Sequence, residues 1–190
     1  MTDAPAASPP RLPTEFPDRR EREIRLTELD GEELDALEPM YRGYDPRDRA
    51  QGIPPATPVG VRRWLDGLRG ALHVAAVHGD RPVGHAFLAP EPGPDADPAA
   101  GVEGGAGADG GRSAELAIFV DGPYQDAGIG TRLMEALLGL GARRGIRRVW
   151  LVVQRSNGPA VRLYRKTGFE ITDAGRAELE MERELEPPED

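Results

Sequence analysis

The chain has 190 residues, 38% of them hydrophobic, and a net charge of −9 at pH 7. This length fits one domain with a sizeable core, and the acidic balance excludes general nucleic-acid binding, because phosphate contacts dominate that affinity. The absence of cysteine excludes disulfides, thiolate metal ligands and a cysteine acyl-enzyme. With no apolar run long enough to span a membrane and no signal-peptide pattern, we expect a cytoplasmic protein without a membrane partner.

Two segments have compositions typical of flexible chain. Residues 1–20 are rich in Pro and Ala without periodicity, so we expect a disordered tail before a single domain at residues 21–186. Glycines, prolines and alanines dominate residues 90–112, which predicts a flexible insertion. The first strand is expected at residues 23–27.

The next elements are predicted to be helices. Asp30 and Glu33 form a capping-box pattern for a helix through about Met40. Residues 41–55 combine tyrosines and arginines with prolines and glycines, and are interpreted as an ordered loop. Apolar residues at helical spacing predict a second helix at residues 57–68.

The middle of the chain predicts the centre of a sheet. Residues 71–77 and 82–88 flank a Gly-Asp pair and predict a β-hairpin. Residues 116–120 are apolar on both faces, as in a central strand, and an amphipathic helix follows at residues 129–145.

The last third predicts two strands and a short helix. Residues 149–153 are expected to form a second central strand. A helix then begins after Asn157 and ends at Gly168. Glutamates alternate with apolar residues at 177–185, which predicts a charged final strand near an edge of the sheet.

A strand that leads through Gln125, Gly128 and Gly130 into a helix predicts a phosphate cradle. The first amides of a helix have no partner within it, and the helix dipole adds positive charge at the same point. The segment 128–166 carries nine basic residues against one acid, Glu135, which favours a polyanionic small ligand.

Two motifs occur in order, Gln125-x-x-Gly128-x-Gly130 and Asn157-x-x-Ala160-x-x-Leu163-Tyr164-x-Lys166-x-Gly168-Phe169. Together they resemble the GNAT superfamily of N-acetyltransferases, and the likeness extends over roughly residues 25–185. It implies an α+β fold, with a splayed, mostly antiparallel seven-stranded sheet flanked by about four helices. It also implies that acetyl-CoA binds between the fourth and fifth strands and that its acetyl group passes directly to an amine, without a metal.

The resemblance implies a set of cofactor-binding residues. The backbone of Ile118, Phe119 and Val120 would pair with the pantetheine arm, the amides of Gln125, Asp126, Ala127, Gly128, Ile129, Gly130 and Thr131 would hold the pyrophosphate, and Asn157 would bind the polar arm. Asp126 departs from the family, in which Gly or Arg is frequent, and its charge should weaken cofactor binding unless the carboxylate points away.

Two side chains are candidates for proton transfer. By the resemblance, Glu115 at the start of the fourth strand would take the proton of the acceptor amine, and Tyr164 would protonate or hydrogen-bond the leaving thiolate. Glu115 could instead be a strand-end charge. His85 could face the acceptor or be a hydrogen-bonded structural residue, and the acceptor itself would lie near residues 44–51.

The resulting hypothesis is an acetyl-CoA-dependent N-acetyltransferase acting on a protein lysine, a protein N-terminus or a small amine, as a monomer or homodimer. The alternative is a non-catalytic acyl-CoA sensor, which would need the glycines of the cradle but neither Glu115 nor Tyr164. A nucleotide-binding loop is disfavoured, because Gly130 is followed by Thr131 and Arg132 and not by the Lys-Ser/Thr of that motif.

Overall fold

The structure is a computed structural model and describes residues 10–45, 54–91 and 112–187. The strands are β1 (Thr14–Pro17), β2 (Glu23–Leu29), β3 (Leu72–His78), β4 (Arg81–Pro90), β5 (Arg112–Val120), β6 (Ile146–Gln154), β7 (Glu170–Ala174) and β8 (Glu178–Glu184). The α-helices are α1 (Glu38–Arg42), α2 (Pro58–Gly67), α3 (Ile129–Arg143) and α4 (Gly158–Lys166), with 3-10 helices η1 (Glu33–Leu37) and η3 (Gly122–Tyr124).

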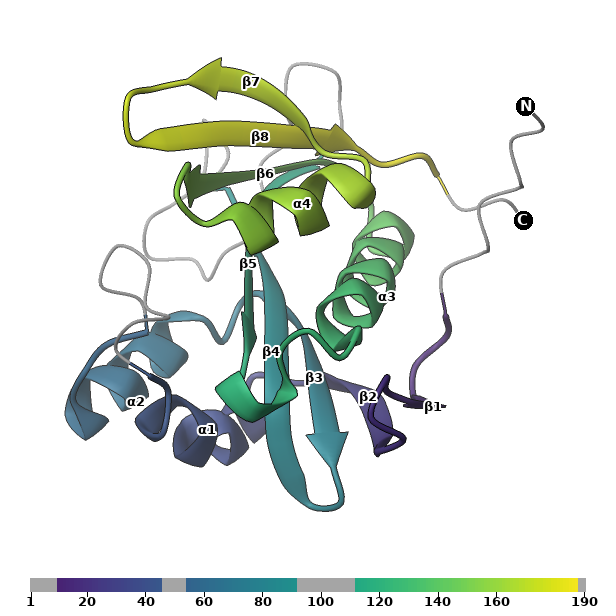
Figure 1. The fold of residues 1–190 in the computed structure, drawn as a ribbon, viewed down its shortest axis with the longest axis vertical. Coiled ribbons are helices and arrows are strands. Elements are labelled where there is room, and N and C mark those ends of the chain that lie inside the picture. The colour runs from purple at the N-terminus through teal and green to yellow at the C-terminus, as the bar shows by residue number, and fades with distance from the viewer. Residues whose placement is uncertain (1–9, 46–53, 92–111, 188–190) are drawn as a thin grey trace.

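Within these residues the strands form one eight-stranded sheet in the order β1-β2-β3-β4-β5-β6-β8-β7. Every neighbouring pair is antiparallel except β5 and β6. Helix α3 packs on one face against strands β2 to β6, while α1 packs against β4 and α2 (Figure 1). Two hydrophobic clusters result, one built around α3 and a more aromatic one around α1 and α2.

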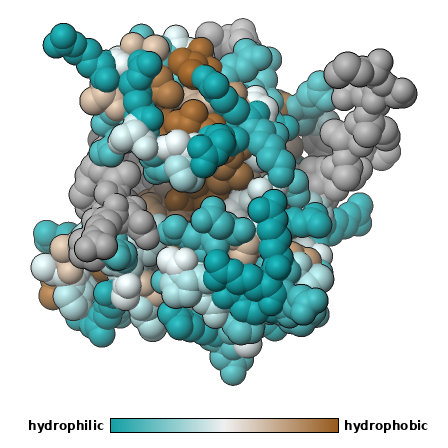
Figure 2. Space-filling view, viewed as in Figure 1, coloured by the Kyte–Doolittle hydropathy of each residue, from teal (hydrophilic) through white to brown (hydrophobic). Residues whose placement is uncertain are grey.

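The sheet divides at the only parallel pair in the described part of the chain. Pairing of β5 with β6 runs from Arg112 to Glu115 and ends where Glu115 lies beside Trp150. Beyond that point β6, β8 and β7 turn away from the other strands (Figure 1). A space-filling view shows apolar side chains exposed in the hollow between these two parts of the molecule (Figure 2).

The predicted fold class is confirmed, with one strand more than expected. The N-terminal tail was predicted to be disordered through residue 20, but Thr14–Pro17 forms the edge strand β1 and pairs with β2. Strand β7 was not predicted, because all five of its residues are exposed and carry no apolar alternation. Strand β8 lies next to that edge, with Leu179 and Met181 buried between half-buried glutamates.

The local signals for helix starts are confirmed. Glu33 accepts from the Asp30 amide at 2.9 Å and donates its own amide to Asp30 Oδ1 at 3.0 Å, which is a reciprocal capping box. The helix there is a 3-10 turn that continues into α1. Thr57 caps α2 through the Gly60 amide at 3.1 Å.

Parts of two predictions lie outside the described residues. These are most of the insertion expected at 90–112 and residues 46–53 of the expected acceptor loop. In the described ranges, no helix combines the length and apolar composition that a membrane span requires.

Candidate functional site

The start of α3 has the geometry of an anion cradle. Gly128 is the N-cap, with φ of +88°, a backbone conformation that glycine adopts without strain. The first helical bond is donated by Arg132 to Gly128 O, at 3.3 Å. In the described part of the chain, the amides of residues 128–131 donate no hydrogen bond, so they are free to bind an acceptor.

Gly130 lies close to its neighbours in α4 and β5. A Cβ at Gly130 would lie 3.4 Å from Leu163 Cδ2 and 3.9 Å from Val120 Cγ2. The start of α3 therefore lies close to both α4 and β5, with room for no more than a small side chain. The cradle amides consequently stand at the edge of the gap between β5 and β6.

In the loop before α3, the expected phosphate-binding amides are not all free. The Gln125 amide is taken by Gly122 O at 3.1 Å, and its Nε2 donates to Val120 O, also at 3.1 Å. Gln125 therefore fixes the loop to the end of β5. Asp126 is exposed and has φ of +56°, which explains why glycine suits this position. The Ala127 carbonyl accepts from the Arg19 amide at 3.0 Å.

The expected pantetheine-binding segment is an open strand edge. Ile118 pairs with Ala86 of β4 on one side, whereas the described part of β6 has no pairing with β5 beyond Glu115. An extended ligand could add to this edge as a strand. Phe119 is anchored between Tyr41, Tyr44, Trp64 and Phe87 by ring contacts, and the Val120 carbonyl is already occupied by Gln125.

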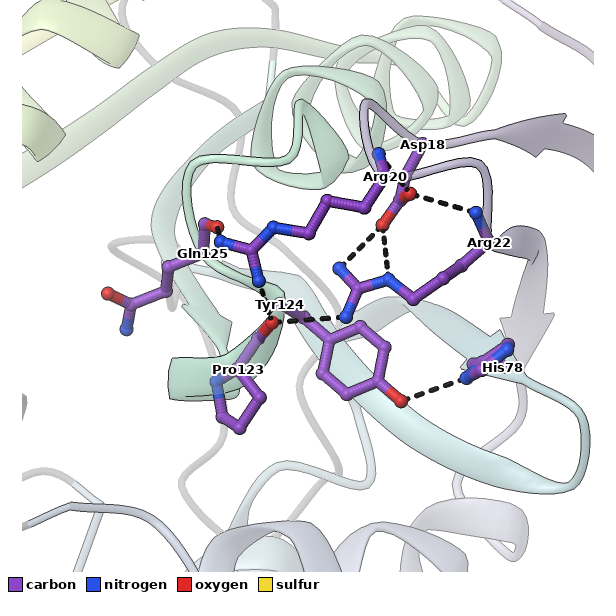
Figure 3. A network of polar contacts seen from close by, with 7 residues as sticks. All are labelled: Asp18, Arg20, Arg22, His78, Pro123, Tyr124 and Gln125. Carbon is purple, nitrogen blue, oxygen red and sulfur yellow. Dashed lines mark hydrogen bonds and ion pairs between the residues drawn. The ribbon is translucent and has the colours of Figure 1, made fainter.

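The turn between β1 and β2 supports the cradle loop (Figure 3). Asp18 accepts from the amides of Arg20 and Arg22 at 2.8 and 3.0 Å, and from Arg22 Nε at 2.8 Å. Arg20 and Arg22 both donate to Pro123 O, at 2.7 and 3.0 Å, and the Arg22 guanidinium lies 4.0 Å from the centroid of the Tyr124 ring. Burial alone raises the pKa of Asp18, but the hydrogen bonds from Arg22 and Arg20 outweigh it and lower that pKa.

Tyr164 and Asn157 lie on and before α4. Burial raises the pKa of Tyr164 to about 12, so its hydroxyl is protonated at neutral pH. The Tyr164 ring packs against Phe169 with centroids 5.9 Å apart. Asn157 caps α4, since its side-chain oxygen accepts from the Ala160 amide at 3.2 Å. That oxygen is thus engaged in the helix cap.

Glu115 lies inside β5, not at its start, because the strand begins three residues earlier at Arg112. It is the last residue of β5 that pairs with β6, at the closed end of the splay. Its side chain is exposed, and it shares a sheet face with Phe119. Partial burial and the nearby Glu91 carboxylate raise the pKa of Glu115, which favours a proton acceptor over a fixed anion.

His85 is a buried link in a hydrogen-bonded chain. Tyr41 Oη lies 2.5 Å from His85 Nδ1, His85 Nε2 lies 3.1 Å from His73 Nδ1, and His73 Nε2 lies 2.8 Å from Leu68 O. Because a carbonyl only accepts, His73 donates to Leu68, His85 donates to His73, and Tyr41 donates to His85. Burial, followed by the effect of His73, lowers the pKa of His85 well below its usual value. His85 is fully buried and hydrogen-bonded through both ring nitrogens. Of the two alternatives, a residue that faces the acceptor or a hydrogen-bonded structural residue, this arrangement fits the second.

A pocket of about 370 Å³ opens beside the cradle. Its walls come from β1 and the turn after it, from the start of α3 and from the end of α4, and include Phe16, Pro17, Arg19, Gly128, Thr131, Arg132, Glu135 and Lys166. Only Arg132 and Lys166 of the nine basic residues in the segment 128–166 line it. Several others form contacts elsewhere, such as the ion pairs of Arg144 with Glu28 and of Arg148 with Glu91. Fewer basic side chains of this segment therefore line one pocket than the sequence predicted.

Comparison with known proteins decides the family. Residues 34–169 match the sequence family described as the Acetyltransferase (GNAT) family. The chain belongs to this family. The described ranges contain no group of three or more His, Asp or Glu side chains that could hold a metal ion.

Relatives of known structure share the fold at low sequence identity. The GNAT domain of S. lividans PAT superposes with a TM-score of 0.71 at 18% identity, over 91% of this chain and 97% of that chain. The ribosomal-protein-alanine N-acetyltransferase of Brucella melitensis gives 0.61 at 21%, over 84% and 99%. The yncA protein of Salmonella typhimurium, a putative acetyltransferase determined with its cofactor acetyl-CoA, gives 0.62 at 16%, over 86% and 94%.

One group of curated relatives is more similar over a shorter stretch. The chain is 42% identical over 52 residues to the [ribosomal protein bS18]-alanine N-acetyltransferase of Escherichia coli K12, which is 27% of this chain and 35% of that protein. The match thus spans about a third of the length of that relative. Family and fold class are confirmed, and an acetyl-CoA-dependent N-acetyltransferase is what this family membership supports.

Proposed function

We propose that this protein transfers the acetyl group of acetyl-CoA directly to a primary amine. The observation that carries the proposal is the meeting, at the β5–β6 splay, of an open strand edge with the free amides of residues 128–131. An extended arm can lie on the first and a pyrophosphate on the second, as the donor requires. Membership in an acetyltransferase family agrees with this assignment.

The proposed chemistry uses one base and one acid. Glu115 accepts a proton from the acceptor ammonium group, and the free amine then attacks the acetyl carbonyl carbon while the carbon–sulfur bond breaks. Tyr164 donates its proton to the departing thiolate. The nitrogen of the new amide then gives up its second proton, which returns through water to the Tyr164 phenolate, and Glu115 releases its proton to solvent. The raised pKa of Tyr164 keeps the phenol protonated until the thiolate departs, and the raised pKa of Glu115 brings its basicity closer to neutral pH.

For the acceptor we favour the N-terminus of a protein. Support comes from the local identity with the bS18-alanine N-acetyltransferase and from the fold shared with the ribosomal-protein-alanine enzyme of Brucella melitensis. Lysine side chains and small amines are the other candidates. Direct transfer is consistent with the absence of cysteine from the sequence.

A thiol-release assay with acetyl-CoA tests the proposal. The full chain is offered peptides with N-terminal alanine, the same peptides with a blocked N-terminus and an internal lysine, and small amines. We expect release of CoA with the free N-terminal peptides. Calorimetric binding of CoA without thiol release for any acceptor would instead identify an acyl-CoA sensor, and absence of binding would overturn the assignment altogether.

A further inference from the structure

We propose that Arg19, in the turn between β1 and β2, is a phosphate-binding residue for the acetyl donor. The proposal rests on the function proposed above and adds to it a residue from outside the GNAT motifs. Arg19 belongs to a segment whose composition predicted a disordered tail, and no cofactor-binding pattern points to it. Its position follows from the pairing of β1 with β2.

The Arg19 side chain stands beside the cradle. A Cβ added to Gly128 would lie 3.7 Å from Arg19 Nε and 3.9 Å from Arg19 Cγ. The guanidinium therefore adjoins the N-cap of α3, where the free amides begin. Arg19 also lines the 370 Å³ pocket that opens from this point.

The charges around the pocket favour an anion. Three basic side chains line it, Arg19, Arg132 and Lys166, against one acidic side chain, Glu135. Arg132 lies 3.6 Å from Glu135 and 5.6 Å from the centroid of the Phe16 ring, so part of its charge is compensated. Among the described residues, no ion pair or side-chain hydrogen bond engages Arg19 or Lys166. Two cations thus remain available to phosphate oxygens.

The turn holds Arg19 in place before any ligand binds. The Arg19 amide donates to Ala127 O, which ties its backbone to the cradle loop. On either side, Asp18 is buried and hydrogen-bonded, and Arg20 is bound to Pro123 O (Figure 3). A guanidinium on a fixed backbone loses less conformational freedom on binding, which raises its contribution to affinity.

The ligand chemistry is phosphate, and acetyl-CoA offers it as the pyrophosphate and as the 3′-phosphate. Calorimetric titration of the full chain with CoA and with 3′-dephospho-CoA distinguishes the two. The variant Arg19→Gln should raise the Kd for CoA about fivefold at low salt, with a smaller effect at high salt. Arg19→Lys should restore much of the affinity, because it keeps the charge.

The matched control is Arg25→Gln, an equal change of charge at an exposed position on β2 that lines a separate pocket beside η1. It should leave the Kd within about twofold. Arg19→Gln changes only an exposed side chain, so its circular dichroism and melting temperature should match wild type.

Each outcome decides the proposal. A loss confined to CoA and absent with 3′-dephospho-CoA assigns Arg19 to the 3′-phosphate, and an equal loss with both ligands assigns it to the pyrophosphate. Equal Kd values for wild type and Arg19→Gln with both ligands would overturn the proposal, as would an equal loss in Arg25→Gln. Failure of wild type to bind either ligand would overturn the proposed function as well.

Discussion

The two faces of the central strands differ in how they are built. On the α3 face, free backbone amides and an open strand edge form the proposed donor site, and the side chains there mainly hold the backbone in place. On the α1 and α2 face, aromatic rings surround Phe119, and a chain of neutral polar groups runs through His85. A site built from backbone constrains glycine positions in the sequence, whereas a site built from side chains leaves no comparable pattern.

The largest expected effect lies at Tyr164, in the hydrophobic cluster on the α3 side. The variant Tyr164→Phe removes one hydroxyl, so CoA affinity should hardly change while kcat falls about 10²- to 10⁴-fold, the usual range for general acid catalysis. Tyr124→Phe is the matched control, because it also removes one tyrosine hydroxyl. The Tyr124 hydroxyl is hydrogen-bonded to His78 at 2.9 Å and has no role in the proposed chemistry. An unaltered kcat in Tyr164→Phe would mean that water protonates the thiolate.

The donor face is tested by Gly128→Asp. A carboxylate beside the free amides would compete with the phosphates, so we expect CoA affinity to fall about 100-fold or more. Gly145→Asp is the control at the other end of α3, since Gly145 has φ of +83° and nothing within 4 Å of an added Cβ. Comparable loss of CoA binding in both variants would trace the effect to backbone strain and not to the cradle.

Glu115 tests the acceptor side through pH. Glu115→Gln should lower kcat about tenfold or more at neutral pH, and the deficit should shrink at alkaline pH as the amine loses its proton in solution. In wild type, activity needs the ionised carboxylate, so it should rise as pH increases through the raised pKa of Glu115. Glu91→Gln removes one cause of that raised pKa and should move the rise to lower pH. A deficit that stays constant with pH would indicate lost positioning of the acceptor.

The smallest effect on catalysis is expected from Tyr41. Tyr41→Phe leaves His85 Nδ1 buried without a donor, which should lower the free energy of unfolding by about 1–3 kcal/mol. The Kd for CoA should stay unchanged, because the chain lies on the face away from α3. Denaturant unfolding and calorimetry measure the two quantities, and a weakened Kd with unchanged stability would show that the faces are coupled.

The sequence allowed prediction of features that few residue types can satisfy. A left-handed N-cap such as Gly128, a reciprocal cap such as Asp30 with Glu33, and the alternation along β8 each follow from local geometry. The histidine chain depends on the register of β3 with β4, which pairs Ala75 with His85, and no local pattern encodes it. The local geometry at the start of α3 could therefore be predicted from the sequence, whereas the histidine chain could not.

Strand β1 was missed for a related reason. Its residues alternate only between half-buried and exposed, and its stability comes from partners distant in sequence. The bond from Arg22 to Pro123 O joins residues 101 positions apart. Composition alone therefore predicted flexible chain at residues 14–17, and the contribution proposed for Arg19 could not be inferred without the fold.

The same distant contact has a consequence for biosynthesis. Residues 18–22 leave the ribosome long before Pro123 and Ala127, to which they bind, so the support of the donor loop can assemble only late in synthesis, and such non-local contacts form slowly. Removal of the first 22 residues, or a bulky fusion joined directly to β1, should therefore lower the affinity for acetyl-CoA more than the affinity for the amine acceptor.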